Sequence, residues 1–276
     1  MTLLSSLRSR IFLTSALLAV LSIGVAVYLV SITVTREAEG ALQREIVATG
    51  ALVEQLRTTR AQTFTMMARL IADTPKLRAA VAEDDPATVQ SPLEDIASQN
   101  QLNAQLLQVT NASGTVLATV GTDARSGLVF SYQPSISEAK AGRESFSLLP
   151  QPNGILQLVI VPIRVGSAVK GTLSVGFLLD DAMATQLKEI TGSEISFGMD
   201  GQILASTLPR PERAALGTLL RSSEGSQNVT IGTDEFVALP LPLSTAGHGA
   251  VPEGGPVALI LRSRTEHLRF LQTIHT

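Results

Sequence analysis

The longest uncharged stretch of the chain lies close to its N-terminus. No Asp, Glu, Lys or Arg occurs between Ile11 and Val34. A helix of this length would be about 36 Å long at 1.5 Å per residue, whereas a hydrocarbon core is about 30 Å thick. Signal peptides have apolar regions of only about 7–15 residues, followed by a small-residue cleavage site. The segment is longer and lacks a clear site of this kind, so we predict an uncleaved transmembrane helix over residues 11–34.

The charges on either side of this segment predict its orientation. Arg8 and Arg10 precede it without an acidic neighbour, whereas Arg36 on the far side is offset by Glu37. Because basic residues favour the cytoplasmic side, residues 1–10 are expected in the cytoplasm. The rest of the chain is then expected outside the inner membrane, as a periplasmic or extracellular part of a single-pass membrane protein.

Helical periodicity continues over residues 35–80, which we interpret as a long stalk helix. Apolar or small residues recur there in steps of three and four: Leu42, Ile46, Thr49, Val53, Leu56, Phe64, Met67, Leu70 and Ile71. This stripe is compatible with a helix that lies on its own domain and with a helix that pairs with a partner in a homodimer, and both can hold at once. Pro75 disfavours helical geometry at Thr74, so a break is expected near Asp73. A second, short helix is expected at about 86–99.

An internal repeat follows the stalk. Leu106–Thr119 and Ile195–Ser206 share the pattern Gly-x-(Val/Ile)-Leu-Ala-(Thr/Ser), which begins at Gly114 and at Gly201. Small polar residues precede each of these glycines. Since Asn, Asp and Gly supply the positive φ of tight hairpin turns, each copy predicts a strand, a turn and a strand.

Two further matches occur in the same order along the chain. Residues around Pro162 match those around Pro240, and the segment that begins at Gly171 matches the one that begins at Gly255. The three pairs are offset by 87, 78 and 84 residues. Ordered matches at nearly constant spacing indicate two copies of one structural unit.

Each copy is predicted to continue with three more strands. The first copy gives strands at 144–149, 155–165 and 171–179, and the second gives strands at 227–231, 235–243 and 256–262. A helix at about Asp181–Ile190 joins the copies, with Asp180 or Asp181 as its N-cap. The apolar runs 158–163 and 173–179 are too continuous for strands with one face in water, so they predict central strands covered on both faces.

This arrangement resembles the double Cache sensory domains of bacterial membrane receptors. The resemblance covers residues 36–264 and implies an α+β fold: an N-terminal transmembrane helix and a long stalk helix, followed by two tandem PAS-like antiparallel-sheet modules. It implies a membrane-distal module at 81–180, a membrane-proximal module at 181–263, and a helical exit segment at 264–276 that leads to a second membrane helix. In that family, small ligands sit between the sheet and the covering loops of the distal module. The amino-acid-binding branch has a signature that includes Trp and Tyr, and this chain, with no Trp and two Tyr, does not match it.

Composition excludes several other functions. The net charge is −3 and no basic stripe is present, so nucleic acid is not expected as a partner. Cysteine is absent, which excludes disulfides and thiolate chemistry. His248, His267 and His275 do not have metal-ligand spacing, and no phosphate loop or nucleophile elbow occurs. We therefore expect no catalytic residues, no metal and no cofactor, and no enzyme activity in this chain.

Three polar residues are the candidate ligand contacts. Tyr132 and Arg143 lie in or beside the expected covering loop of the first copy, and Gln157 is a polar residue on an otherwise apolar strand. The sequence thus favours a sensor that detects a small molecule or an envelope signal. Its signal would pass to a cytoplasmic output domain or partner, such as a histidine kinase or a nucleotide cyclase. The alternative is a membrane-anchored structural or interaction protein with a ligand-free Cache-like fold.

Overall fold

The computed structural model describes residues 7–99, 104–121, 133–221, 225–243 and 254–264; the side chains of residues 7–16, 26–27, 29–39, 99 and 133 are not described. The chain divides into two compact units, Met1–Glu45 and Ile46–Thr276. Helix α1 (Leu7–Ala72) contributes residues to both units. The exit segment predicted at 264–276 lies outside the described residues from position 265 onward.

The first unit contains the N-terminal part of α1. Leu17, Leu18 and Leu21 on this part are exposed. Over the part of the chain that the structure describes, no helix combines the length and the apolar character needed to cross a membrane. Most of the side chains in the span predicted at 11–34 are outside the described set.

The break predicted near Asp73 is confirmed. Helix α1 ends at Ala72, and helix α2 (Pro75–Glu83) begins with a proline. Thr74 between them is extended, with ψ of 124°, because the residue before a proline disfavours the helical region. Four further helices and two short 3-10 turns belong to the second unit: α3 (Pro86–Gln99), α4 (Gln133–Lys140), α5 (Asp181–Thr191), α6 (Arg210–Arg213), η2 (Ala214–Leu216) and η3 (Leu219–Arg221).

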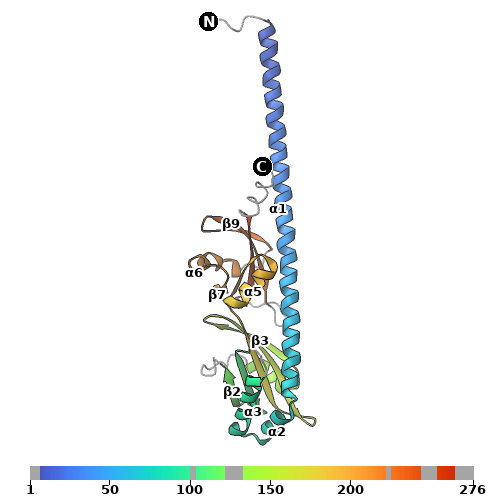
Figure 1. Cartoon of the computed structure of the whole chain (residues 1–276), viewed down its shortest axis with the longest axis vertical. Coiled ribbons are helices and arrows are strands. Elements are labelled where there is room, and N and C mark those ends of the chain that lie inside the picture. Colours follow the sequence, from blue (N-terminus) through green and yellow to red (C-terminus); the bar gives the residue numbers. More distant parts are fainter. Residues whose placement is uncertain (1–6, 100–103, 122–132, 222–224, 244–253, 265–276) are drawn as a thin grey trace. The chain divides into compact units, whose positions relative to one another are not determined.

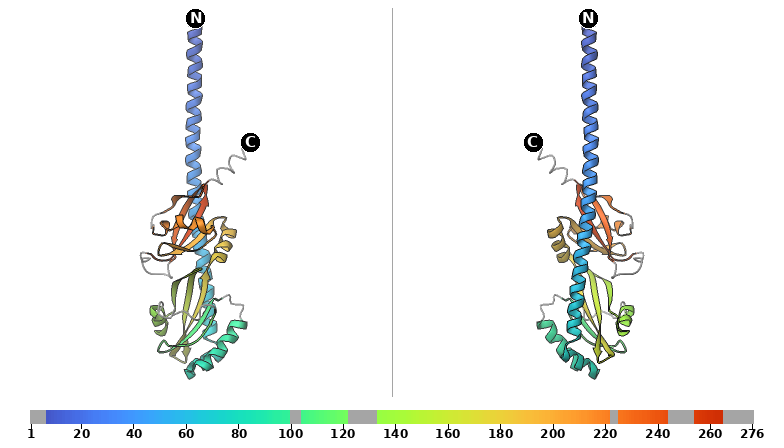
Figure 2. Two further views of the ribbon diagram at one scale, coloured as in Figure 1. Left: turned by 90° about the vertical axis from the view of Figure 1, so that its left-hand side faces the viewer. Right: turned by 90° about the vertical axis from the view of Figure 1, so that its right-hand side faces the viewer.

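Two five-stranded antiparallel sheets form the framework of the second unit (Figure 1). The first sheet has the order β2-β1-β5-β4-β3 and the second has the order β7-β6-β10-β9-β8. Their strands are β1 (Leu106–Asn111), β2 (Val116–Gly121), β3 (Ser145–Gln151), β4 (Gly154–Val165) and β5 (Ala168–Leu179), then β6 (Glu194–Met199), β7 (Gln202–Ser206), β8 (Gln227–Ile231), β9 (Asp234–Pro242) and β10 (Val257–Ser263). Adding five to each strand number of the first sheet gives the second, so the α+β fold with two repeated sheets is confirmed. Figure 2 shows the strands of both sheets from two further sides.

The repeat motif forms the hairpin turns that its residue types predict. Gly114 has φ of +94° in the turn between β1 and β2, and Asp200 and Gly201 have φ of +54° and +77° between β6 and β7. The third sequence match is displaced, since Gly171 lies within β5 whereas Gly255 precedes β10. The matched strands are still counterparts, because both are the central strands of their sheets.

Both faces of the first sheet are covered, as the apolar runs predict. Side chains alternate along β4: Val159 and Val161 pack with residues of α1, α2 and α3, whereas Leu158 and Ile160 pack with Ile136 of α4. We call these the α1 face and the α4 face of the first sheet. A strand with a covered surface on each side needs apolar residues at consecutive positions, which accounts for the uninterrupted run in β4.

The stalk stripe lies mostly on its own unit. Ile46, Val53 and Ile71 are buried, and the ring of Phe64 stacks on Phe177 of β5 with centroids 3.3 Å apart. The expectation that this helix packs on its own domain is therefore confirmed.

Two members of the predicted stripe do not lie on this buried face. Met67 and Leu70 are exposed, so packing on the chain's own unit accounts for only part of the stripe. For Leu70 the physical reason is helical phase: neighbouring residues on an α-helix are about 100° apart, which turns Leu70 away from the buried Ile71.

Candidate ligand-binding site

A row of polar side chains lies on the α4 face of the first sheet, on its central strands. Gln108 of β1 is opposite Ser174 of β5, and Thr110 is opposite Thr172. All four are buried. Thr119 of the neighbouring strand β2 continues the row next to Gln108. We call these five residues the polar stripe.

Most of the polar stripe is internally hydrogen-bonded. The hydroxyl oxygens of Thr110 and Thr172 are 2.7 Å apart, and Gln108 Nε2 donates to Thr119 Oγ1 at 3.2 Å. Ser174 is different, because its Oγ is fully buried and has no hydrogen-bond partner. Among the described residues, this is the only buried side-chain oxygen or nitrogen in that state. An unpaired buried hydroxyl costs about 1–3 kcal/mol, so it calls for an explanation.

Apolar residues and a glycine adjoin Ser174 on the same face. Ile160 of β4 lies directly opposite it, and Leu106 and Leu158 flank Gly176 two positions further along. A Cβ atom at Gly176 would lie 3.0 Å from both Leu106 Cβ and Leu158 Cδ2. The stripe itself contains no charged residue, so it offers hydroxyl and amide groups beside an apolar surface.

The second sheet fills the corresponding face with its own side chains. Strand β10, the counterpart of β5, contributes Val257, Leu259 and Leu261, and these pack with Leu216 and Leu220 of the short 3-10 turns. In the row Thr172–Ser174–Gly176 of β5, small and polar residues stand where β10 has branched apolar ones. The central strand β5 therefore offers polar groups on this face, whereas the central strand β10 does not.

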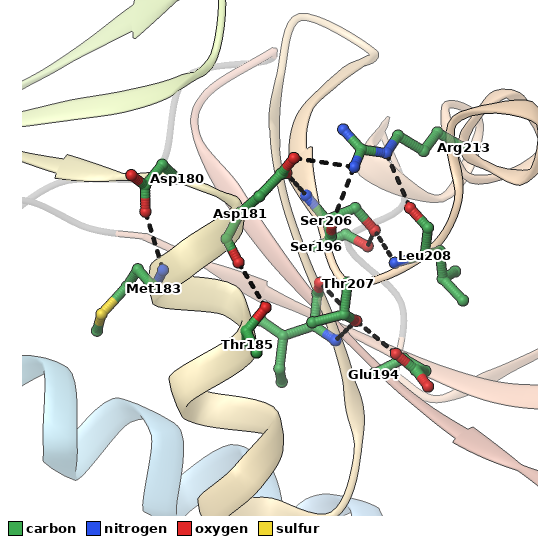
Figure 3. A network of polar contacts seen from close by, with 11 residues as sticks. Asp180, Asp181, Met183, Thr185, Glu194, Ser196, Ser206, Thr207, Leu208 and Arg213 are labelled. Atoms are coloured by element: carbon green, nitrogen blue, oxygen red, sulfur yellow. Dashed lines mark hydrogen bonds and ion pairs between the residues drawn. The ribbon is translucent and has the colours of Figure 1, made fainter.

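The buried hydroxyls of Ser196 and Ser206 on the second sheet are paired (Figure 3). The Oγ atoms of Ser196 and Ser206 are 2.7 Å apart, and Ser206 Oγ also accepts from Leu208 N at 2.9 Å. Asp181 of α5 accepts from Ser206 N at 2.7 Å and from Arg213 Nη2 at 3.2 Å. This network fastens the start of α5 to the end of β7, and its satisfied bonds give it a structural role.

Of the three predicted ligand contacts, the two that the structure describes are not brought together. Tyr132 lies outside the described residues. Arg143 is exposed and donates from Nε to Glu138 Oε2 at 2.6 Å; this hydrogen bond, and then the charge attraction, raise the pKa of Arg143 and lower that of Glu138. Gln157 is buried but lies on the α1 face, opposite Phe177. Ligand binding by these residues stays a prediction.

The sequence analysis did not predict the polar stripe, because single Thr, Ser or Gln residues within a strand give no sign of a ligand site. A usable signal was present in β5, where Thr172, Ser174 and Gly176 occupy every second position between apolar residues. Alternation of this kind in a central strand means that one covered face is polar. The sequence does not reveal whether a hydroxyl on such a face finds a partner.

Two tandem sheets of identical strand order, preceded by a long helix, define the class of double Cache sensory domains. The family model described as the double sensory domain of two-component sensor kinases matches residues 40–247. The chain therefore belongs to this family. No curated protein sequence matches the chain.

Solved structures with the same fold are sensory domains of bacterial receptors. The periplasmic domain of Vibrio cholerae LuxQ has a TM-score of 0.56 and 17% identity, and the match covers 79% of this chain and 99% of that one. The ligand-binding domain of the Campylobacter jejuni chemoreceptor Tlp3, in complex with 4-methylisoleucine, has a TM-score of 0.53 and 15% identity, with 84% and 93% covered. The ligand-binding domain of the Pseudomonas fluorescens chemoreceptor CtaA, in complex with L-isoleucine, has a TM-score of 0.50 and 13% identity, with 86% and 97% covered. At these identities the likeness establishes the fold alone.

Proposed function

We propose that this chain is the extracytoplasmic sensor of a membrane receptor and that it binds a small molecule at the polar stripe of the first sheet. The observation that carries the proposal is the buried, unpaired hydroxyl of Ser174. A ligand oxygen or nitrogen that reaches this group would remove its desolvation cost, and this gain would favour binding. The family membership of residues 40–247 supports a sensory role.

Membrane anchoring is the second part of the proposal. The uncharged segment 11–34 is long enough to cross a bilayer as a helix, and Arg8 and Arg10 favour a cytoplasmic N-terminus. The described apolar side chains within it, such as Leu17 and Leu21, have no protein cover, which is the state expected of lipid-facing residues. The bulk of the chain would then lie in the periplasm or outside the cell.

The output of the receptor is the third part. A module boundary near 180 and a helical exit at 264–276 would lead from the second sheet to another membrane helix and a cytoplasmic output domain or partner, such as a histidine kinase or a nucleotide cyclase. Two copies would act together as a homodimer through the stalk at 35–80.

Strand β5 supports a route from the ligand to the stalk. Ser174 points to the α4 face of the first sheet, whereas Phe177 on the same strand points to the α1 face and stacks on Phe64. If ligand contact displaces β5, the contact between Phe177 and Phe64 would therefore displace α1 directly. The second sheet would not be needed to transmit this displacement. Helices and strands transmit such shifts because packed interiors deform little.

A thermal-shift screen of small molecules on the intact chain tests the ligand site. We expect a specific compound to stabilise the protein by about 2.7 kcal/mol at a concentration of 100 Kd. Ser174→Ala should leave the unliganded protein equally stable or more stable, since it deletes an unpaired group, and should weaken the ligand-induced shift.

Ser196→Ala is the matched control, because it removes a buried hydroxyl that is paired. It should lower the stability of the unliganded protein by about 0.5–1.5 kcal/mol and leave the ligand-induced shift unchanged. A full ligand-induced shift in Ser174→Ala would contradict the site. The absence of any stabilising compound would favour the ligand-free interaction protein instead.

A further inference from the structure

Methionine is the only sulfur-containing residue type in this chain. Cysteine is absent and five methionines are present. An oxidant that meets the protein therefore has thioethers as its sulfur targets, and each thioether is converted reversibly to a polar sulfoxide. Met66 and Met67 are exposed on α1, whereas Met183 at the start of α5 is half-buried. Met183 stands apart because of what its sulfur contacts.

The sulfur of Met183 faces a cation. Arg60 of α1 donates from Nη1 to Met183 Sδ at 2.8 Å, and the contact lies at the surface of the unit. A thioether is a weak acceptor, whereas a guanidinium bonds most strongly to oxygens that carry negative charge. In the described part of the chain, the other partner of Arg60 is the ring of Phe64, at 5.3 Å. Arg60 thus directs its donors at a poor acceptor.

Both sides of this contact are held in place by other bonds. The backbone N–H of Met183 donates to Asp180 Oδ1 at 2.9 Å, which is the N-cap bond of α5. Figure 3 shows the side chain of Met183 pointing away from the network around Asp181. Arg60 is positioned by the face of the Phe64 ring. An oxygen atom added to the sulfur would therefore form beside a donor that is already in position.

The contact joins α1 to the end of the first sheet. Helix α5 follows β5 through the single residue Asp180. The Phe64 ring beneath Arg60 stacks on Phe177, which belongs to β5 as well. A stronger bond between Arg60 and Met183 would therefore restrain α1 against both the end of β5 and the start of α5.

We propose that Met183 is a modification site, where a peroxide oxidises the thioether to a sulfoxide whose oxygen accepts a hydrogen bond from Arg60. A sulfur lone pair attacks one peroxide oxygen, so that the S–O bond forms as the O–O bond breaks. The proton of that oxygen passes to the departing hydroxide, which leaves as water. The sulfur loses two electrons and the peroxide gains them. The proposal rests on the extracytoplasmic location proposed above, where oxidants arrive first, but it does not require the ligand site.

The sulfoxide is a better partner for Arg60 than the thioether. Its oxygen is a strong acceptor, and a hydrogen bond from a charged donor is stronger than one between neutral groups. Oxidation of methionine usually disrupts the packing around it, whereas here it supplies the acceptor that Arg60 lacks. Because reductases restore the thioether, the bond between α1 and α5 can be strengthened and released again. Oxidants then act on α1 by a route separate from the polar stripe.

Oxidation of the purified full chain by hydrogen peroxide tests this proposal. Peptide mass spectrometry locates the added oxygen, and thermal unfolding is measured before and after treatment. The parent protein carries Met66→Leu, Met67→Leu and Met199→Leu, so that Met183 is the oxidisable methionine within the described residues. We expect oxidation to raise its unfolding temperature by about 2–4 °C, the size of shift that one favourable contact produces in a large domain.

Two further substitutions in this parent are the matched controls. Met183→Leu keeps the volume and removes the sulfur, so peroxide should leave its unfolding temperature unchanged. Arg60→Ala keeps the sulfur and removes the donor, so oxidation should no longer raise the unfolding temperature. Each variant is compared with its own untreated form, so that a change in basal stability does not affect the comparison.

Three outcomes overturn the proposal: no sulfoxide at Met183 under conditions that oxidise Met66 in the natural sequence, an unchanged or lower unfolding temperature after oxidation, or an equal rise in Arg60→Ala. The measurement uses neither a ligand nor a membrane. Its failure therefore leaves the ligand site and the anchoring untouched, and those are tested by the ligand-induced shift of Ser174→Ala and by reporter fusions.

Discussion

Asp180 and Asp181 connect the last strand of the first sheet to α5, and the two aspartates have different contacts. Asp180 is the N-cap of the helix and accepts from Met183 N at 2.9 Å. Asp181 is the first helical residue and reaches across to Ser206 N and Arg213. One carboxylate therefore stabilises the start of α5, and the other ties that start to the second sheet.

Replacement of Asp180 by Ala should destabilise the protein by about 1 kcal/mol, because one helix N–H loses its acceptor. Asp180→Asn is the control, since an asparagine oxygen caps a helix about equally well. Urea unfolding followed by circular dichroism measures both. Equal loss in the two variants would mean that the charge of Asp180, and not its capping bond, is what matters.

Residue roles that depend on local geometry were predictable, and those that depend on distant neighbours were not. A capping aspartate at 180 or 181 and the turn at Gly114 follow from residue type and the next few positions; both are confirmed, and the structure selects Asp180 as the cap. The unpaired state of Ser174 depends on which atoms β1, β4 and α4 bring near it. No pattern within β5 contains that information.

At the scale of elements, α1 is a helix with two different long faces. One face carries Ile46, Val53 and Ile71 into the interior of the second unit, and the other carries Leu52, Met66 and Leu70 outward. The predicted apolar stripe contained residues of both faces, because residues on either face of a helix recur in steps of three and four. Exposure of the individual side chains separates them.

Adjacent substitutions on α1 should therefore have opposite effects. Val53→Asp would bury an unpaired carboxylate and should cost several kcal/mol of stability. Leu52→Asp should change the stability by no more than about 0.5 kcal/mol. In the proposed homodimer through the stalk, it should also reduce disulfide-linked dimers of a Met66→Cys variant, because it brings like charges close to each other. Thermal unfolding and cross-linking measure the two effects. Unfolding of Leu52→Asp, or normal dimers in it, would contradict the assignment of faces.

At the scale of the whole molecule, the repeat in the sequence predicted the architecture. The shared Gly-x-(Val/Ile)-Leu-Ala pattern located two hairpins, and both lie at the same place in sheets of equivalent strand order. The order of the strands within each sheet did not follow from the repeat, because matching segments indicate that two units are alike and not how their strands pair. The pairing of β5 with both β1 and β4 is a result of the three-dimensional structure.

Membrane orientation is a prediction at this scale. Alkaline phosphatase joined after Arg264 should be active, because residues beyond the segment 11–34 are expected outside the cytoplasm. β-Galactosidase joined at the same position should be inactive. Exchange of Arg8 and Arg10 for Glu should reduce the phosphatase activity by weakening the positive-inside signal. The reverse pattern of the two reporters would show that the bulk of the chain stays in the cytoplasm.

The packing of α1 on late parts of the chain has a consequence for biosynthesis. Ribosomes complete α1 before any strand, yet Arg60 meets a residue 123 positions later, and Gly50 lies against Leu239 and Ile260 near the end of the chain. Until those residues emerge, the apolar face of the helix has no partner, and the nascent chain is exposed to aggregation. Contacts between such distant positions also slow folding. We therefore expect a chaperone to protect the nascent α1 and folding to finish only after β10 has been made.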